Sequence, residues 1–360
     1  MKRVKSCLSI ILSLLLLACS DSDMYSEYAE YVYEDNRVEI LNHIEVGNAI
    51  FGTPAVSANE NVIIGSHDKH IYFLNKSGEL ISSYKTKGWI HASPKVLSDG
   101  SIVIGSYDKH IYFFSEMGHL LDKIKPGGFI FTSVSELPDR KIVFGTNKAG
   151  IVYYHMPTET YSIYPTKRLA HGSPAILSDT SVIIGSNDKK IHLLNSEGNE
   201  IWSIKTGGWI VHSAPLELSN SHIAVGCYDN NLYILNRNGE IVCRFETEGK
   251  VHSNPLQLKN GNIVFGSFDG NVYFINSKGE LVNKFQTGGK VISSPVKYAE
   301  DKVIIGSYSK CLCFFNLSGE LTGIYPTKGK IFSTPVVLSN KTIVVCSTNG
   351  IIEFIKVKGI

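Results

Sequence analysis

The chain has 360 residues, with 35 Lys and Arg against 33 Asp and Glu. Three of the basic residues (Lys2, Arg3 and Lys5) belong to a predicted signal segment. Without them, 32 basic side chains remain against 33 acidic ones, a net charge of −1. This balance gives no indication of the basic face that nucleic-acid binding requires, so we expect no nucleic-acid partner. The length is large for one domain unless the domain grows by repetition.

The first predicted element is a secretory signal over residues 1–18. Its basic residues precede an apolar run from Cys7 to Ala18, which is too short to span a bilayer. Leu16-Leu17-Ala18-Cys19 resembles a bacterial lipobox and predicts lipidation of Cys19. An ordinary signal peptide that happens to end before a cysteine is the alternative.

Residues 19–36 form an acidic segment that we interpret as a solvated tether. It contains tyrosines and several Asp and Glu residues but no basic residue: Asp21, Asp23, Tyr25, Glu27, Tyr28, Glu30, Tyr31, Tyr33, Glu34 and Asp35. Ser20 after the cysteine resembles an outer-membrane address, whereas the acidic run resembles surface-export signals of some bacteria. We therefore expect a lipid-anchored protein of the bacterial envelope, on the outer membrane, with either side of that membrane open.

From residue 37 onward the sequence repeats with a period of about 40 residues, which indicates a propeller, a solenoid or an array. Each of eight units contains a Gly-Ser pair or a variant of it, beginning at Gly65, Gly105, Gly145, Gly185, Gly226, Gly266, Gly306 and Cys346. A proline precedes each pair, except where Val134 replaces it: Pro54, Pro94, Pro174, Pro215, Pro255, Pro295 and Pro335.

Each unit predicts four short strands and no helix. Apolar runs such as 62–64 and 71–74 are rich in β-branched and aromatic residues and are bounded by Gly, Asp, Asn and Ser, which favour turns. In the first unit we expect strands over about 50–56, 61–66, 70–75 and 79–86. Four-stranded antiparallel units that are apolar on both faces pack around an axis as a β-propeller.

The two ends of the chain complete one unit between them. The last unit, from Lys328, lacks its fourth strand, whereas residues 39–47 align with the fourth strand 280–288 of an internal unit. Since an open edge promotes aggregation, we expect the N-terminal strand to pair with the C-terminal unit. The prediction is one eight-bladed β-propeller domain over 37–360.

The pattern Gly-Ser-x-Asp-x-x-Ile-Tyr-x-Leu-Asn-x-x-Gly-Glu, followed by Lys-Thr-Gly-Gly and Ser-Ser-Pro, resembles the quinoprotein (PQQ-like) propeller repeat. The resemblance covers about 37–360 and implies the fold strongly but the function weakly. The family's usual Trp on the fourth strand survives only as Trp202. Unit three, 127–166, departs furthest, with Lys148 in place of Asp and His155-Met156-Pro157 in place of the Asn-x-x-Gly turn.

Catalytic chemistry is not indicated. The cysteines after Cys19 are odd in number and contain no Cys-x-x-Cys, so we interpret them as small buried side chains, with a disulfide between blades as the alternative: Cys227, Cys243, Cys311, Cys313 and Cys346. The aspartates that recur at one turn are structural, because a catalytic carboxylate would break the symmetry: Asp68, Asp108, Asp188, Asp229 and Asp269. The adjacent cysteines of quinone enzymes are missing, and we expect no cofactor and no metal.

One column of residues predicts a site at the mouth of the central channel. The residues before the Ser-Pro step are Phe51, His91, Phe131, His171, His212, His252, Ile292 and Phe332. Two positions earlier come Ala49, Trp89, Phe129, Leu169, Lys250, Lys290 and Lys330, with Trp209 nearby, and we expect His67, His70 and His110 on the same face. Aromatic rings and cations together suit an anionic or aromatic ligand or partner. Alternatively, bulky residues fill the channel while lysines reach water. A metal at the histidines is disfavoured, because His91 lies two blades from His171.

Three functions fit these features. The repeat, the predicted anchor and the lack of catalytic residues resemble the BamB family of lipoproteins, which implies a monomeric scaffold that binds protein partners in outer-membrane protein assembly. A small-molecule or glycan-binding lipoprotein that uses the channel mouth is the second function, and a quinone-dependent dehydrogenase is a remote third. We also hypothesise that the irregular blade three carries the interaction.

Overall fold

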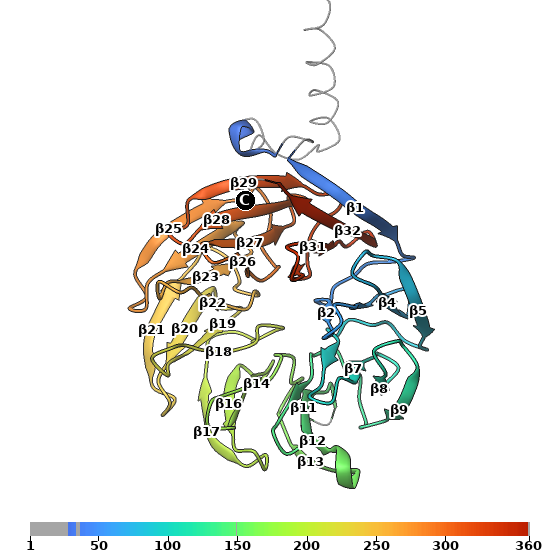
Figure 1. Cartoon of the computed structure of the whole chain (residues 1–360). Helices are drawn as coiled ribbons and strands as arrows, with labels where there is room; N and C mark the ends of the chain where they lie inside the picture. Colours follow the sequence, from blue (N-terminus) through green and yellow to red (C-terminus); the bar gives the residue numbers. More distant parts are fainter. Residues whose placement is uncertain (1–27, 34–36, 149, 359–360) are drawn as a thin grey trace, which may run out of the picture.

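The computed structural model describes residues 28–33, 37–148 and 150–358. Eight four-stranded antiparallel sheets surround a central axis as blades of a closed ring (Figure 1). The predicted eight-bladed β-propeller is therefore confirmed. The predicted signal and Cys19 lie outside the described residues, so the anchor remains a prediction. No helix in the described part of the chain is long and apolar enough to cross a membrane.

Within each blade the four strands lie side by side, with the first strand at the channel and the fourth strand at the outer rim. Blade one consists of β2 (Ala55–Val56), β3 (Val62–Gly65), β4 (His70–Leu74) and β5 (Leu80–Lys85). Blade two consists of β6 (Lys95–Val96), β7 (Ile102–Gly105), β8 (Ile111–Phe114) and β9 (Leu120–Ile124). Blade three consists of β10 (Ser135–Glu136), β11 (Lys141–Gly145), β12 (Ile151–His155) and β13 (Thr160–Tyr164). Blade four consists of β14 (Ala175–Ile176), β15 (Val182–Gly185), β16 (Lys190–Leu194) and β17 (Glu200–Lys205). Blade five consists of β18 (Leu216–Glu217), β19 (Ile223–Gly226), β20 (Asn231–Leu235) and β21 (Ile241–Glu246). Blade six consists of β22 (Leu256–Gln257), β23 (Ile263–Gly266), β24 (Asn271–Ile275) and β25 (Leu281–Gln286).

Blade seven is β26 (Val296–Ala299), β27 (Lys302–Ser307), β28 (Cys311–Asn316) and β29 (Leu321–Pro326). Blade eight is β30 (Val336–Val337), β31 (Ile343–Cys346), β32 (Ile351–Val357) and β1 (Val38–Glu45). Two short 3₁₀ helices, η1 (Ala29–Tyr31) and η2 (Met156–Thr158), accompany them. The innermost strands are shorter than expected: β2 covers only the end of the predicted strand 50–56, because the residues before it line the channel.

The hydrophobic core lies between the blades. The middle strands, such as β3, β7 and β24, are buried along their whole length, because each is covered by a blade on either side. Ile63 and Phe73 of blade one pack against Ile104 and Phe114 of blade two, with the two phenylalanine rings 5.4 Å apart. Each such side chain contributes roughly 1.5–3 kcal/mol when buried.

The repeated glycine of the Gly-Ser pair is required by this stacking. A Cβ atom on Gly65 would lie 2.2 Å from Ile90 Cγ2, and one on Gly105 would lie 2.3 Å from Ile130 Cγ2. Ile90 and Ile130 belong to the connections that lead into the next blade. The glycine therefore lets neighbouring blades approach at the channel, which explains its recurrence.

The ring closes as predicted, through the N-terminal strand. β1 pairs antiparallel with β32, from Val38 opposite Val357 to Glu45 opposite Ile351. At the channel, the Thr334 N–H of blade eight donates to Thr53 Oγ1 of blade one at 3.3 Å. Blade eight is thus built from both ends of the chain, which leaves no open gap in the ring.

Part of the predicted tether packs on the propeller. Val32 pairs in parallel with Ile324 of β29, and the Tyr33 N–H donates to the Ile324 carbonyl at 2.8 Å. Tyr33 is buried, and a Cβ on Gly323 would lie 2.1 Å from its ring, so the glycine opens a notch for it. The expectation of a solvated segment is therefore wrong for Tyr33 and for the partly covered Tyr28, Tyr31 and Val32, because aromatic burial outweighs the acidic composition, whereas Ala29 and Glu30 are exposed.

Candidate functional site: the channel and its mouth

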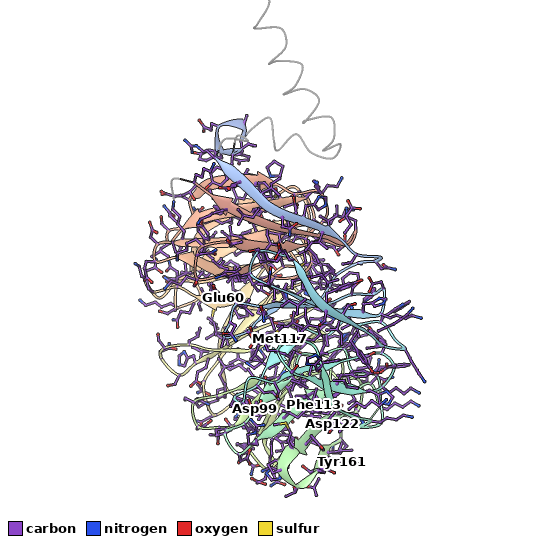
Figure 2. All side chains as sticks on the ribbon, turned by 45° about the vertical axis from the view of Figure 1, so that its right-hand side comes forward. Glu60, Asp99, Phe113, Met117, Asp122 and Tyr161 are labelled. Carbon is purple, nitrogen blue, oxygen red and sulfur yellow. The ribbon has the colours of Figure 1, made fainter. Side chains whose placement is uncertain are left out.

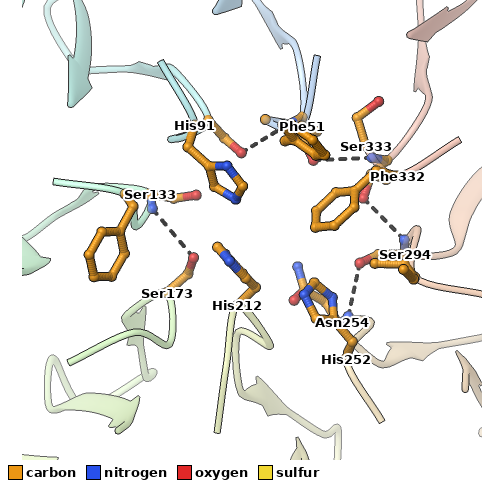
Figure 3. A pocket seen from close by; sticks show the side chains of 16 residues that line it. Phe51, His91, Ser133, Ser173, His212, His252, Asn254, Ser294, Phe332 and Ser333 are labelled. Atoms are coloured by element: carbon orange, nitrogen blue, oxygen red, sulfur yellow. Dashed lines mark hydrogen bonds between the residues drawn. The ribbon is translucent and has the colours of Figure 1, made fainter. Parts of the chain in front are cut away.

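The structure brings the predicted column together inside the channel (Figure 3). The ring centroids of His171 and His212 are 4.4 Å apart, and those of His212 and His252 are 5.0 Å apart. Phe51 stacks on His91 at 5.0 Å, and Phe332 meets His252 edge-on at 5.2 Å. These side chains form a layer of rings across the channel.

His212 reaches the middle of this layer because unit five carries one inserted residue. It has a φ of +59°, and its N–H donates to the His171 carbonyl at 3.1 Å. From there its ring lies 4.9 Å from that of His91, on the far side of the channel (Figure 3). The expectation that His91 lies too far from the other histidines to join them is therefore wrong.

The free space next to this layer is small. The cavity, about 60 Å³, is lined by the rings and by a circle of small polar residues. These residues join successive blades: the Thr53 N–H donates to Ser93 Oγ at 2.9 Å, and the Asn254 N–H donates to Ser294 Oγ at 2.8 Å. The space has room for only a few water molecules, whereas ligand pockets measure roughly 300–1,000 Å³. The geometry agrees with the alternative that bulky residues fill the channel.

The channel histidines do not supply positive charge. Burial lowers the pKa of His91 and His252 to about 3 and that of His171 to about 4, and repulsion between imidazoles adds to the shift of His91 and His252. Burial, followed by the neighbouring histidines, also holds the pKa of His212 well below its usual value. The histidines are therefore neutral at pH 7. No three His, Cys, Asp or Glu side chains within the described ranges come together as a metal site.

The outer rim of the mouth is different, since it is exposed. Trp89 is 51% exposed and Trp209 44%. Lys250 lies over the Tyr228 ring at 4.9 Å, Lys290 over Phe268 at 5.2 Å, and Lys330 over Tyr308 at 5.9 Å. Such cation–π contacts hold the ammonium groups in place at the rim. The aromatic partners of these lysines were not among the predicted site residues.

The histidines of the turns do not act alike. His67 stacks on Trp89, with the rings 5.2 Å apart and 9° from parallel, and its Nε2 lies 3.1 Å from Nδ1 of His91. His70 and His110 instead place Nδ1 3.3 and 3.2 Å from the carboxylates of Asp68 and Asp108. Only His67 therefore joins the mouth as expected.

The recurring aspartates are structural, as expected. Asp229 accepts the Tyr233 hydroxyl at 2.6 Å and the Gly207 N–H, on the connection between blades, at 2.8 Å. Burial opposes its ionisation, but these bonds, led by that of Tyr233, outweigh burial and lower the pKa of Asp229. Asp68, Asp108 and Asp269 accept the same set of bonds from a tyrosine and two backbone N–H groups. His192 replaces the tyrosine beside Asp188.

The cysteines agree with small buried side chains. Cys227, Cys311, Cys313 and Cys346 are buried, and Cys243 is half-buried. The Sγ atoms of Cys311 and Cys313 are 3.5 Å apart, well beyond the roughly 2.05 Å of a disulfide bond.

Comparisons with known proteins agree with this architecture. A family model described as outer membrane protein assembly factor BamB matches residues 154–359, more than half of the chain. The crystal structure of BamB from Moraxella catarrhalis is similar, with 18% identity, a TM-score of 0.75, and coverage of 90% of this chain and 98% of that one. The computationally designed Ika8 protein matches at 16% identity with a TM-score of 0.73, over 86% of this chain and 96% of its own. No curated protein sequence matches.

The two structural matches show the fold alone, since both fall below 25% identity. The family match shows family membership as well as the fold, because it covers four complete blades and the part of blade eight that the C-terminal strands supply. The chain belongs to the PQQ-like β-propeller family whose model is described as outer membrane protein assembly factor BamB.

Proposed function

We propose that this protein is a non-catalytic, monomeric lipoprotein scaffold of the bacterial envelope, which binds protein partners in outer-membrane protein assembly and is anchored through Cys19. The observation that carries the proposal is a rigid closed ring whose channel is filled and whose connections and rim strands are exposed. Rigid blades that display variable loops suit partner binding. Membership in a family described as an assembly factor supports the same role.

Two features support a non-catalytic role. The recurring aspartates use their oxygens to tie blades together, which leaves none of them as a symmetry-breaking catalytic group. The quinone of the family's enzymes does not fit the channel, because a cavity of about 60 Å³ is far below the volume that such a ligand needs. We derive no reaction through this group.

The outer edge of blades two and three supports a docking role for that region. Met117 is 49% exposed and Tyr161 62%, on the turn of blade two and the outermost strand of blade three (Figure 2). Leu121, on β9, is 59% exposed. Other rim strands also expose an apolar residue, for example Leu80 and Leu281. Blade three adds η2 and the exposed β13, where the repeat is least regular. Exposed apolar clusters often mark protein interfaces.

The experiment that tests this proposal is crosslinking of the tagged, lipidated protein in its native membrane, followed by mass spectrometry. We expect capture of a barrel-assembly protein. Replacing residues 155–160 with the regular Asn-x-x-Gly turn should abolish capture, whereas exchanging the regular turn 75–79 for the sequence of 276–280, which keeps the net charge, should not. Absence of any assembly protein from the crosslinks, with the chain present in the membrane, would overturn the proposal.

A second candidate function rests on Trp89 and Trp209, whose exposed rings at the mouth suit stacking on a small aromatic ligand or a glycan. If this function holds, a ligand should change the tryptophan fluorescence of the wild type, and Trp89→Ala and His212→Asn should weaken the response. A neighbouring glycan transporter gene would favour it over the scaffold.

A further inference from the structure

The two faces of the ring carry opposite charge, although the whole chain is close to neutral. We call the face formed by the connections between blades and the turns between second and third strands the mouth face. In blade one these are residues 86–94 and 66–69. The opposite face consists of the turns between first and second and between third and fourth strands, for example 57–61 and 75–79.

The mouth face is strongly basic. Its basic residues come from every blade except blade five, if the connection that leads into a blade is counted with that blade: Lys69, Lys87, Lys109, Lys125, Lys148, Lys167, Arg168, Lys189, Lys250, Lys290, Lys310, Lys328 and Lys330. Apart from the five structural aspartates, its only acidic residue in the described chain is Glu248. The composition alone gave no indication of this basic face.

The opposite face is acidic. Its acidic residues are Glu60, Glu79, Asp99, Glu116, Asp139, Glu159, Asp179, Glu197, Glu240, Glu280, Glu300, Asp301 and Glu320. Its basic residues are fewer: Lys76, Arg140, Arg237, Lys259, Lys278 and Lys341. The excess of basic residues on the mouth face is about as large as the excess of acidic residues on the opposite face. The charges therefore cancel in the net charge of the chain, although they are separated in space.

Several basic side chains of the mouth face contact a histidine or an aromatic ring: Lys328 Nζ lies 3.0 Å from His43 Nδ1, and Lys109, Lys250, Lys290 and Lys330 lie over aromatic rings. Setting Lys310 aside, all the basic side chains of this face are exposed, and none comes within 4.0 Å of a carboxylate oxygen of a described residue. On the opposite face the two arginines are paired, since Arg140 Nη2 lies 2.6 Å from Asp99 and Arg237 pairs with Asp179 and Glu217. The four lysines of that face form no ion pair with a described carboxylate. Charge on the mouth face is left for an external partner.

Exposed aromatic residues accompany this charge. Trp89, Phe129 and Trp209 are 51%, 36% and 44% exposed, on three connections of the same face. Together with the exposed lysines they form the pattern that is typical of a membrane–water interface, where indole rings lie at the headgroups and lysines contact anionic lipid.

We propose that the mouth face docks on the surface of an anionic phospholipid bilayer. Three observations favour a bilayer over an acidic protein. The charge is spread around the ring rather than gathered in a groove, the exposed rings stand on separate connections rather than in one packed pocket, and the channel between them is filled. This inference does not depend on the scaffold role, since vesicle binding requires no protein partner.

The test uses residues 20–360 without lipid, which include every strand of the closed ring. Co-sedimentation is measured with vesicles of equal parts phosphatidylethanolamine and phosphatidylglycerol, and with phosphatidylcholine alone. We expect binding to the anionic vesicles only, with loss in about 1 M salt, where the Debye length falls to about 3 Å. Tryptophan fluorescence should shift to the blue on binding, because Trp89 and Trp209 move from water to the headgroups. The third tryptophan, Trp202, should not contribute, because its Nε1–H is already bonded to the Arg237 carbonyl.

The variants compare the two faces. Lys250→Gln with Lys290→Gln and Lys330→Gln should weaken binding to anionic vesicles about 100-fold, because each lysine near the surface contributes roughly a factor of five. The matched control, Lys76→Gln with Lys259→Gln and Lys278→Gln, removes the same charge from exposed positions of the opposite face and should bind as the wild type does. Trp89→Ala with Trp209→Ala should weaken binding without changing its salt dependence.

Equal binding to both kinds of vesicle, or equal loss in the two lysine variants, would overturn the inference. A chain that binds no vesicles but crosslinks to an acidic protein would also overturn it. If the mouth-face variant no longer formed that crosslink, the face would be assigned to a protein partner. Salt-sensitive self-association in sedimentation velocity, lost in the mouth-face variant but kept or strengthened in the control variant, would instead assign it to the acidic face of a second copy. Thermal unfolding of each variant verifies that the ring is intact.

Discussion

The two faces of the ring use the same kinds of charged residue in different ways. On the mouth face, aspartates such as Asp229 turn inward and bond to the next connection, while the cations point to water. On the opposite face, cations such as Arg140 are paired, with Asp99 and Glu136 at 2.6 and 3.2 Å. Carboxylates hold both faces together, through Asp229 on the mouth face and through Glu217, which accepts from Ser178 of the neighbouring blade, on the opposite face. The arginines of the opposite face join these contacts, whereas the exposed cations of the mouth face remain available for binding.

The largest effect is expected from removing an inward carboxylate. Asp229→Ala leaves the Tyr233 hydroxyl and the Asn231 N–H, both in part-buried bonds, without their acceptor. Leaving a buried donor without its charged acceptor costs roughly 1–3 kcal/mol. We therefore expect the free energy of unfolding to fall by about 3 kcal/mol. Urea unfolding measures it. Tyr233→Phe is the control and should cost about 1 kcal/mol; a cost for Asp229→Ala no larger than this would contradict the structural role.

The next effect depends on pH. Because the pKa of His91 is about 3 in the folded ring and near 6.5 when unfolded, the folded state binds fewer protons between these values. Stability is therefore lost as the pH falls below about 6.5, at up to about 1.4 kcal/mol per pH unit for each such histidine. His91→Phe, which copies Phe51 and Phe131 of neighbouring units, should reduce the loss between pH 7.5 and 5.5 by about 1 kcal/mol. An unchanged loss would mean that His91 titrates normally.

A cation of the opposite face should matter less. Arg140 bridges Asp99 of blade two and Glu136 of blade three, and all three are at least partly open to solvent. Exposed ion pairs contribute about 0–1 kcal/mol, so Arg140→Gln should cost less than about 1 kcal/mol in urea unfolding, and less still at high salt. A cost that salt does not reduce would show that packing, not charge, is what the arginine provides.

The smallest effect is expected on the mouth face. Lys250→Gln removes one cation–π contact with Tyr228, worth roughly 0.5 kcal/mol at an exposed site. Differential scanning calorimetry should show a melting temperature within a few degrees of the wild type. A larger decrease would mean that the mouth lysines are structural and would weaken the inference that they face a partner.

Most of the fold could be predicted from the sequence, because its determinants are local and repeated. The Gly-Ser pair marks the close approach of Gly65 to Ile90, and the alignment of 39–47 with 280–288 predicts the pairing of β1 with β32. The packing of Tyr33 on β29 could not be predicted, because its acidic neighbours suggested solvent and the notch depends on Gly323, far away in sequence.

The site was predicted only in part. The column of channel residues follows from the repeat, but the position of His212 depends on one inserted residue and its left-handed backbone. The neutral state of the histidines depends on burial, which the sequence does not show. The basic face was missed because opposite charges of the two faces cancel in the composition, and only the topology of the turns separates them.

Hydrogen exchange, measured by mass spectrometry with the chain bound to phosphatidylglycerol-containing vesicles and free, tests the difference between the faces most directly. We predict slower exchange on vesicles in the connections 86–94, 247–255, 287–295 and 327–335, with no change in the turns 57–61, 75–79 and 276–280. Protection of those turns, or of neither face, would contradict the account.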